Sequence, residues 1–190
     1  AGTSWKYSNT NFMILGLVAE SVGRKSLAKL FTQRFFKPLG LRDTTLGSAN
    51  LRPTVASYLI TVNQTTTPKQ LTWERFANQT NNNAMWAWAA GGIQSTSCDL
   101  GVWVRALISG KVLDRAHRKL MQTASPQSRR VIPNTVGPYA SPYWTGYGLG
   151  LMQYKYLGTV GWGHGGNITG FASSAVWLPS RKRGISLITP

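Results

Sequence analysis

The sequence of residues 171–188, FASSAVWLPSRKRGISLI, decides the fold class. Its first eight residues and its last five are rich in the apolar side chains of strands, and a charged connection that begins at Pro179 separates them. Two strands joined by so short a connection must run antiparallel, because parallel strands need a long crossover. We therefore expect an antiparallel sheet in the last third of the chain.

A third strand is predicted at residues 147–156, where apolar and polar side chains tend to alternate. Helical patterns dominate the earlier part of the chain. Residues 11–22 are so continuously apolar that we expect a mostly buried helix, which ends at Gly23. Ser26 is a good N-cap for a second helix that extends to about residue 36, so the two helices should form a hairpin.

Two further helices are predicted in the middle of the chain. Thr96 and Asp99 have the spacing of a capping box at the start of a helix that extends to about residue 109. Residues 114–123 should form a helix with a basic face. With the strands that follow, these helices predict an α+β architecture, mainly helical with loops over residues 1–142 and antiparallel strands over residues 143–190.

Two segments predict irregular structure. Residues 43–83 are rich in Thr, Asn, Gln and Pro, and only short strands are expected there, around residues 55–62. A loop that contains Pro and Ser is expected after the fourth helix, through Pro142.

The composition is strongly basic, with 21 Lys and Arg, 5 acidic residues and a formal net charge of +16. Such a charge attracts anionic partners, among which nucleic acids, anionic lipids and cell-wall polymers all qualify. The basic residues are scattered, however, and none of their runs is interleaved with aromatic residues as in a platform for single strands. We therefore expect no specific nucleic-acid site.

Metal and disulfide chemistry are both disfavoured. Cys98 is the only cysteine, and the two histidines, His117 and His164, lie far apart in the sequence from each other. The five acidic residues are dispersed without the spacing of metal ligands. We expect no cofactor and no transmembrane segment, because no apolar run approaches the ~20 residues that span a bilayer. The first residues also lack the pattern of a signal peptide.

Four segments in a fixed order carry a resemblance to a known family. They are YSN at residues 7–9, KPLGLRDTT at 37–45, AAGGIQST at 89–96 and GHGGN at 163–167. In this order they resemble the family that includes class C β-lactamases, D-alanyl-D-alanine carboxypeptidases and related esterases, over nearly the whole chain. The resemblance implies a β-lactamase/transpeptidase-like fold, of which this chain is the C-terminal part of one domain.

The resemblance assigns Tyr7 and Asn9 to the family's Tyr-x-Asn motif. There the tyrosine assists proton transfer to and from the nucleophile, and the asparagine binds the amide side chain of the substrate. A phenol can do this only if cations lower its pKa from ~10, which we expect a basic cleft to do. The alternative is structural: Tyr7 packs beside Trp5, and Asn9 caps the following helix.

The family's third motif, Lys-Thr-Gly or a variant that begins with His, corresponds to His164, Gly165 and Gly166. The resemblance implies that His164 orients the substrate carboxylate or tunes the tyrosine, and that the two glycines let a substrate backbone lie along the strand. It also assigns half of an oxyanion hole to the backbone N–H of Asn167. The alternative is a glycine-rich hairpin in which the histidine has no role.

The family's first motif, Ser-x-x-Lys, is not found before Tyr7. Ser26 and Lys29 have its spacing but follow the tyrosine motif, and Ser26 is explained as an N-cap, so we reject them as nucleophile and base. Nor does the chain contain the Gly-x-Ser-x-Gly of an α/β-hydrolase. We expect this chain alone to be inactive, with the Ser-x-x-Lys supplied by an N-terminal segment or a companion polypeptide.

The leading functional hypothesis is a serine hydrolase that acts through an acyl-enzyme on a β-lactam, a D-amino-acid peptide or an ester. A non-catalytic protein that uses the same cleft to bind a ligand or scaffold a partner is the alternative. A basic nucleic-acid module is a third hypothesis and predicts salt-sensitive binding. The sequence leaves the compartment open, and a periplasmic or secreted location is favoured.

Overall fold

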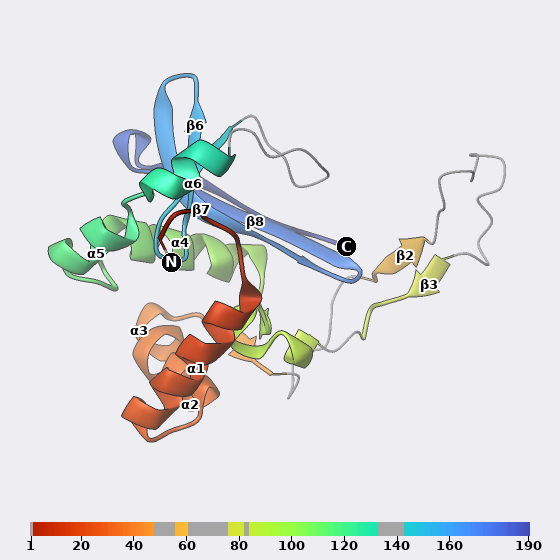
Figure 1. Cartoon of the computed structure of the whole chain (residues 1–190). Helices are drawn as coiled ribbons and strands as arrows, with labels where there is room; N and C mark the ends of the chain where they lie inside the picture. The colour runs from red at the N-terminus through yellow and green to blue at the C-terminus, as the bar shows by residue number, and fades with distance from the viewer. Residues whose placement is uncertain (1, 48–55, 61–75, 82–83, 133–142) are drawn as a thin grey trace, which may run out of the picture.

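The computed structural model describes residues 2–47, 56–60, 76–81, 84–132 and 143–190. Its main feature is one antiparallel sheet of five strands in the order β5-β6-β7-β8-β9 (Figure 1). The strands are β5 (Trp144–Tyr147), β6 (Met152–Tyr156), β7 (Thr159–Ile168), β8 (Phe171–Leu178) and β9 (Arg183–Thr189). Each pairs antiparallel with its neighbour in sequence, so the predicted antiparallel sheet is confirmed.

Six α-helices accompany the sheet. They are α1 (Asn9–Gly23), α2 (Leu27–Phe31), α3 (Lys37–Leu39), α4 (Ser97–Ser109), α5 (Arg115–Met121) and α6 (Pro126–Val131). A π-helical turn over Thr32–Phe36 joins α2 to α3, and 3-10 turns span Ala84–Trp86, Trp88–Ala90 and Pro179–Arg181. The four predicted helices are confirmed by α1, by α2 with the turn that follows it, by α4 and by α5.

The irregular region contains two short strand pairs. β1 (Thr45–Leu46) pairs with β4 (Ile93–Gln94), and β2 (Tyr58–Ile60) pairs with β3 (Phe76–Asn78). β2 falls where short strands were predicted, whereas residues 55, 61 and 62 of that prediction lie outside the described residues. The hydroxyl of the fully buried Ser57 donates to the carbonyl oxygen of Gly170. This contact ties the segment before β2 to the turn between β7 and β8.

Three strand and loop predictions need correction. The strand predicted at residues 147–156 is instead the end of β5, a turn and β6, because β5 ends at Tyr147 and β6 begins at Met152. The turn passes through Gly148, where a Cβ would lie 2.2 Å from the carbonyl oxygen of Met121. The residue pattern gave no strand at 159–168, because glycines interrupt its apolar residues, yet β7 lies at the centre of the sheet.

Part of the loop predicted before Pro142 is helix α6. It forms because Ser125 accepts a hydrogen bond from the backbone N–H of Ser128, and Pro126 occupies the first turn, where its missing N–H costs nothing. Residues 133–142 of the predicted loop lie outside the described residues. The capping box of α4 is half formed: Thr96 caps the helix, but the carboxylate of Asp99 accepts from Asp43 and Thr44 instead.

The core lies between α4 and strands β7, β8 and β9. Its buried members come from α4, the segments around β6 and the centre of the sheet. They are Val104, Leu107, Ile108, Ala124, Leu151, Trp162 and Ala175. Because Trp162 is two residues before His164 on β7, this packing also fixes the part of the strand that carries the GHGGN motif.

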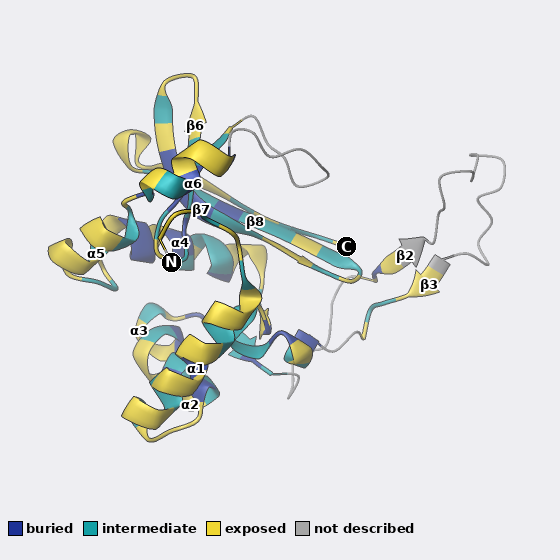
Figure 2. Cartoon of the chain, viewed as in Figure 1, coloured by how far each residue is buried: buried dark blue, intermediate teal, exposed yellow. Residues whose placement is uncertain are grey.

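Two apolar surfaces of the described chain are uncovered, and the prediction of a mostly buried α1 is wrong. Only Gly16 of α1 is buried, against Trp88 and Ala89, while five large apolar side chains face outward (Figure 2). They are Ile14, Leu15, Leu17, Val18 and Val22. On the edge strand β9, Ser186 contacts α4, so Ile185 and Leu187 point to the opposite face, where they are exposed.

Within the described ranges, no helix is long and apolar enough to cross a bilayer. The same residues contain no group of three or more His, Cys, Asp and Glu side chains arranged to hold a metal ion.

Candidate functional site

Tyr7 and His164, from opposite ends of the chain, lie side by side. The centroids of their rings are 6.0 Å apart. Tyr7 belongs to the extended segment before α1, which runs past β7 in Figure 1, and His164 lies in the middle of that strand. The structure therefore brings together the two residues on which the predicted site depends.

Tyr147, the last residue of β5, completes a cluster with Tyr7 and His164. Its ring centroid lies 5.9 Å from that of Tyr7 and 5.7 Å from that of His164, edge to face in both cases. Its hydroxyl oxygen is 3.0 Å from Nε2 of His164. Trp5 packs on the outside of Tyr147, with ring centroids 5.4 Å apart. We call Tyr7, Tyr147 and His164 the aromatic cluster.

Burial governs the protonation of the aromatic cluster. It lowers the pKa of His164, so the imidazole is neutral at neutral pH, although the contact of Nδ1 with the carbonyl oxygen of Gly165 opposes this effect. It raises the pKa of Tyr7. The expectation that a basic cleft lowers the pKa of Tyr7 is therefore not met in this chain, because partial burial of the phenol raises its pKa.

The other predicted site residues of β7 lie beside the aromatic cluster, with Gly165 half-buried and Gly166 and Asn167 exposed. Gly165, Gly166 and Asn167 follow His164 on β7 and pair with residues of β8. On the other side of β7, pairing with β6 stops at Gly163. Residues 164–168 thus present one strand edge without a partner strand among the described residues, and an extended ligand can pair with such an edge.

The glycines of the GHGGN motif differ in what they accommodate. A Cβ on Gly163 would lie 1.8 Å from the carbonyl oxygen of Ala175, so packing within the sheet requires glycine there. At Gly165 a Cβ would meet nothing closer than 3.6 Å. Among the described residues, nothing therefore crowds Gly165, as a strand that receives a substrate backbone needs.

Asn9 is exposed and is the first residue of α1, two residues beyond Tyr7. The N-cap position is occupied by Ser8, so the structural alternative in which Asn9 caps the helix is wrong. Ser26 does cap α2, accepting from the backbone N–H of Lys29, as its rejection as a nucleophile assumed. It lies on the hairpin of α1 and α2, apart from the sheet (Figure 1).

Known proteins resemble this chain in sequence and in fold. A sequence model of the beta-lactamase family matches residues 1–189. The chain belongs to the beta-lactamase family. Among its relatives, the protein flp of Staphylococcus aureus (strain MW2) is 24% identical in an alignment of 190 positions that covers 98% of this chain and 33% of flp.

Solved structures of the family have the same fold. A D-stereospecific amidohydrolase from Streptomyces sp. is 32% identical with a TM-score of 0.76, over 97% of this chain and 50% of that one. A D-amino acid amidase from Ochrobactrum anthropi SV3 in complex with D-phenylalanine is 23% identical with a TM-score of 0.78, over 98% and 51%. The chain thus spans about half the length of these two proteins and a third of flp.

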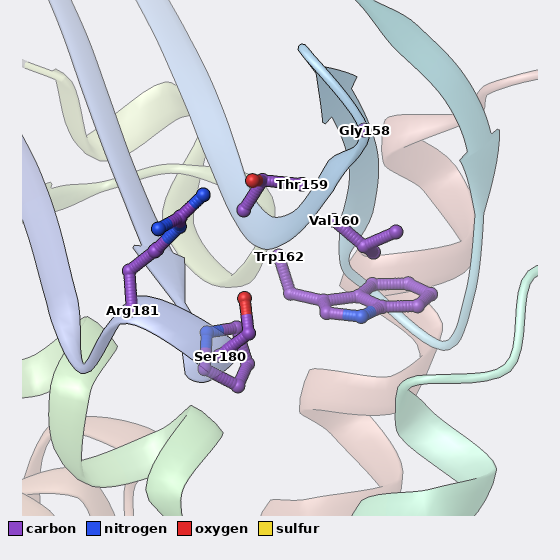
Figure 3. A pocket seen from close by; sticks show the side chains of 7 residues that line it. Gly158, Thr159, Val160, Trp162, Ser180 and Arg181 are labelled. Carbon is purple, nitrogen blue, oxygen red and sulfur yellow. The ribbon is translucent and has the colours of Figure 1, made fainter.

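One surface hollow contains no residue of the aromatic cluster. It is an open depression of about 600 Å³ between the turn that joins β6 to β7 and the 3-10 turn Pro179–Arg181 (Figure 3). It is lined by Gly158, Thr159, Val160, Trp162, Pro179, Ser180 and Arg181. None of the predicted site residues lines it, so we do not assign the family's chemistry to it.

Sequence reasoning missed Tyr147 because residues 147–156 were interpreted as one strand. In that interpretation Tyr147 was an ordinary strand residue. The signal that could have found it is the pair Gly148 and Gly150, whose spacing is typical of a turn. A turn there ends β5 at Tyr147, so the Tyr147 side chain need not follow the alternation of side chains along β6.

The neutral His164 predicts how stability depends on pH. The unfolded imidazole takes up a proton near its usual pKa of 6.5, whereas the folded one does so only at lower pH. The folded state is therefore fully favoured above pH 6.5 and loses stability as the pH falls below that value towards the folded pKa. In His164→Gln this loss should be smaller, as measured by urea unfolding from about pH 7.5 to about pH 5.

Tyr154→Phe is the control for this measurement, since it removes a buried phenol that does not titrate in that range, its pKa being raised to about 12. It should keep the wild-type pH dependence. An unchanged pH dependence in His164→Gln would contradict the assignment of a neutral buried imidazole.

Proposed function

We propose that the complete protein is a serine hydrolase that acts through an acyl-enzyme, and that this chain supplies two walls of its cleft. Tyr7 and Asn9 form one wall, and His164, Gly165, Gly166 and Asn167 form the other. The observation that carries the proposal is the 6.0 Å approach of Tyr7 to His164 in a chain that belongs to the beta-lactamase family. The 190 residues alone should be inactive.

The nucleophile is proposed to come from a Ser-x-x-Lys segment outside this chain. Its serine oxygen attacks the substrate carbonyl carbon, and the resulting oxyanion is stabilised by the N–H of Asn167. The bond to the leaving nitrogen or oxygen then breaks, and Tyr7 passes the serine proton to the leaving group. Water releases the acyl group by the reverse transfers.

The lysine of that segment would offset the burial that raises the pKa of Tyr7. A partly buried phenol is a poor base, because its partial burial raises the pKa and disfavours the anion. An ammonium group within ~4–6 Å would favour the phenolate and shift the pKa in the opposite direction. We infer that Tyr7 becomes competent for proton transfer only when the preceding segment is in place.

The β7 wall favours substrates that lack a carboxylate at this position. Since His164 is neutral, it can contact the substrate by packing but not by charge. Amides and esters suit such a wall better than peptides with a terminal carboxylate. The 32% identical D-stereospecific amidohydrolase supports an amide of a D-amino acid as the substrate class, ahead of a β-lactam or a D-alanyl peptide.

The preceding segment is also the proposed occupant of the two uncovered apolar surfaces. Leu15 and Leu17 on α1 are 60% and 59% exposed, and Ile185 on the edge strand β9 is 70% exposed. Solved relatives twice as long as this chain have additional polypeptide to cover such surfaces. The occupant is therefore the other half of the same domain, covalently attached or as a companion chain.

Acylation tests the catalytic proposal directly. A fluorophosphonate or a fluorescent penicillin should label the complete protein on the preceding segment and leave residues 1–190 unlabelled. Tyr7→Phe should slow labelling about 10²- to 10⁴-fold, the usual contribution of a general acid or base. The control Tyr156→Phe, which removes a half-exposed phenol at the end of β6, should label at the wild-type rate. Absence of labelling in the complete protein would favour the non-catalytic binding protein.

Thermal and denaturant unfolding test the proposed occupant of α1. Leu15→Glu should destabilise the complete protein by ~1.5–3 kcal/mol, the value of a buried leucine, because the side chain is then covered. It should leave the stability of residues 1–190 alone unchanged, since Leu15 is exposed there. The control Leu157→Glu, at an 85% exposed turn position, should affect neither. Equal stability of Leu15→Glu and wild type in the complete protein would rule out this occupant.

A further inference from the structure

Both ring nitrogens of His164 have partners within the chain. Nδ1 contacts the carbonyl oxygen of Gly165, and Nε2 lies 3.0 Å from the hydroxyl oxygen of Tyr147. A carbonyl oxygen only accepts hydrogen bonds, so Nδ1 must carry a proton. The direction of the second bond then depends on whether Nε2 is protonated: in a cation it donates to Tyr147, and in the neutral ring it accepts.

The surroundings decide in favour of the neutral ring. The titratable side chains recorded against the imidazole are two phenols, Tyr7 from the segment before α1 and Tyr147 from β5. Neither is an anion that would stabilise an imidazolium, since burial raises the pKa of both. The hydroxyl of Tyr147 therefore stays protonated and donates a hydrogen bond to Nε2. We propose that Tyr147 is a positioning residue that holds His164 as the neutral imidazole protonated on Nδ1.

Tyr147 is itself fixed by helix α6. Its backbone N–H donates to the hydroxyl oxygen of Ser128 at 2.9 Å, and its carbonyl oxygen accepts from the backbone N–H of Ser125 at 3.0 Å. Ser128 is fully buried, and Tyr147 is 6% exposed. The position of the phenol is therefore set by a helix cap and by Trp5 packed on its ring, before any ligand arrives.

This arrangement gives His164 a defined part in the cleft. With its one proton bound by Gly165 and its one lone pair bound by Tyr147, the ring has neither a charge nor a free nitrogen to offer a substrate. It acts by its shape and by fixing the strand edge at Gly165. This catalytic meaning rests on the proposed function, whereas the tautomer is a property of the resting protein and can be measured without substrate.

The tautomer can be read from the ring ¹⁵N chemical shifts of ¹⁵N-labelled residues 1–190, in which His117 and His164 are the only histidines. A protonated and an unprotonated ring nitrogen have widely separated shifts. At neutral pH the wild-type His164 should show a protonated Nδ1 and an unprotonated Nε2. A cationic ring, or a proton on Nε2 alone, would overturn the proposal even without any variant.

Tyr147→Phe removes the hydroxyl and keeps the ring. The separation between the two His164 nitrogen shifts should shrink towards that of a ring exchanging between tautomers, because Nε2 has lost its donor. The titration of His164 should move to higher pH, since the neutral form has lost a stabilising bond. The resonances of His117 should not change.

Tyr154→Phe is the matched control, because it removes another buried phenol of the same sheet whose hydroxyl bonds to the sulfur of Met152 and not to His164. It should leave the His164 shifts at their wild-type values. Wild-type shifts in Tyr147→Phe, or an equal change in both variants, would overturn the assignment to Tyr147. Failure of the complete protein to acylate would refute the proposed function and leave these NMR results unaffected.

Discussion

The contact of the segment before α1 with strand β7 is the constraint on which the candidate site depends. Tyr7 stands on the segment that leads into the helical hairpin, and His164 stands on the central strand of the sheet. Tyr147 bridges them, since its ring lies within 6 Å of both. Without this packing of three rings, the helical part and the sheet would carry their functional residues on unrelated surfaces.

The sequence predicted most of the fold where local patterns are sufficient. Ser26, Thr96 and Asp114 begin helices because their side chains accept from backbone N–H groups, and this signal needs no tertiary context. β7 was missed because four of its ten residues are glycine, and pairing with β6 and β8, rather than local preference, makes it a strand. The burial of α1 was overestimated because the apolarity of a stretch does not say which surface, if any, of the same chain packs against it.

The candidate site also consists of residues that the sequence predicted and residues that only the structure revealed. Tyr7 and His164 were found through the resemblance of the motifs and their order, because no residue pattern can place two distant segments against each other. Tyr147 and Ser128 carry no motif, and their roles arise from the hairpin turn and the cap of α6. The charge states could be assigned only from the structure, since burial lowers the pKa of His164 and raises that of Tyr7. The lowered pKa leaves the imidazole without a charge, and the raised pKa makes the phenol a weaker acid.

If Tyr7 and the β7 edge enclose a serine from outside this chain, a crystal structure of the complete protein modified by a fluorophosphonate should show the phosphonyl group on a serine of the preceding segment. The serine oxygen should lie about 3 Å from the Tyr7 hydroxyl, and a phosphonyl oxygen should lie about 3 Å from the N–H of Asn167. A modified serine remote from Tyr7 and His164, or side chains of this chain in the space above Gly165, would contradict it.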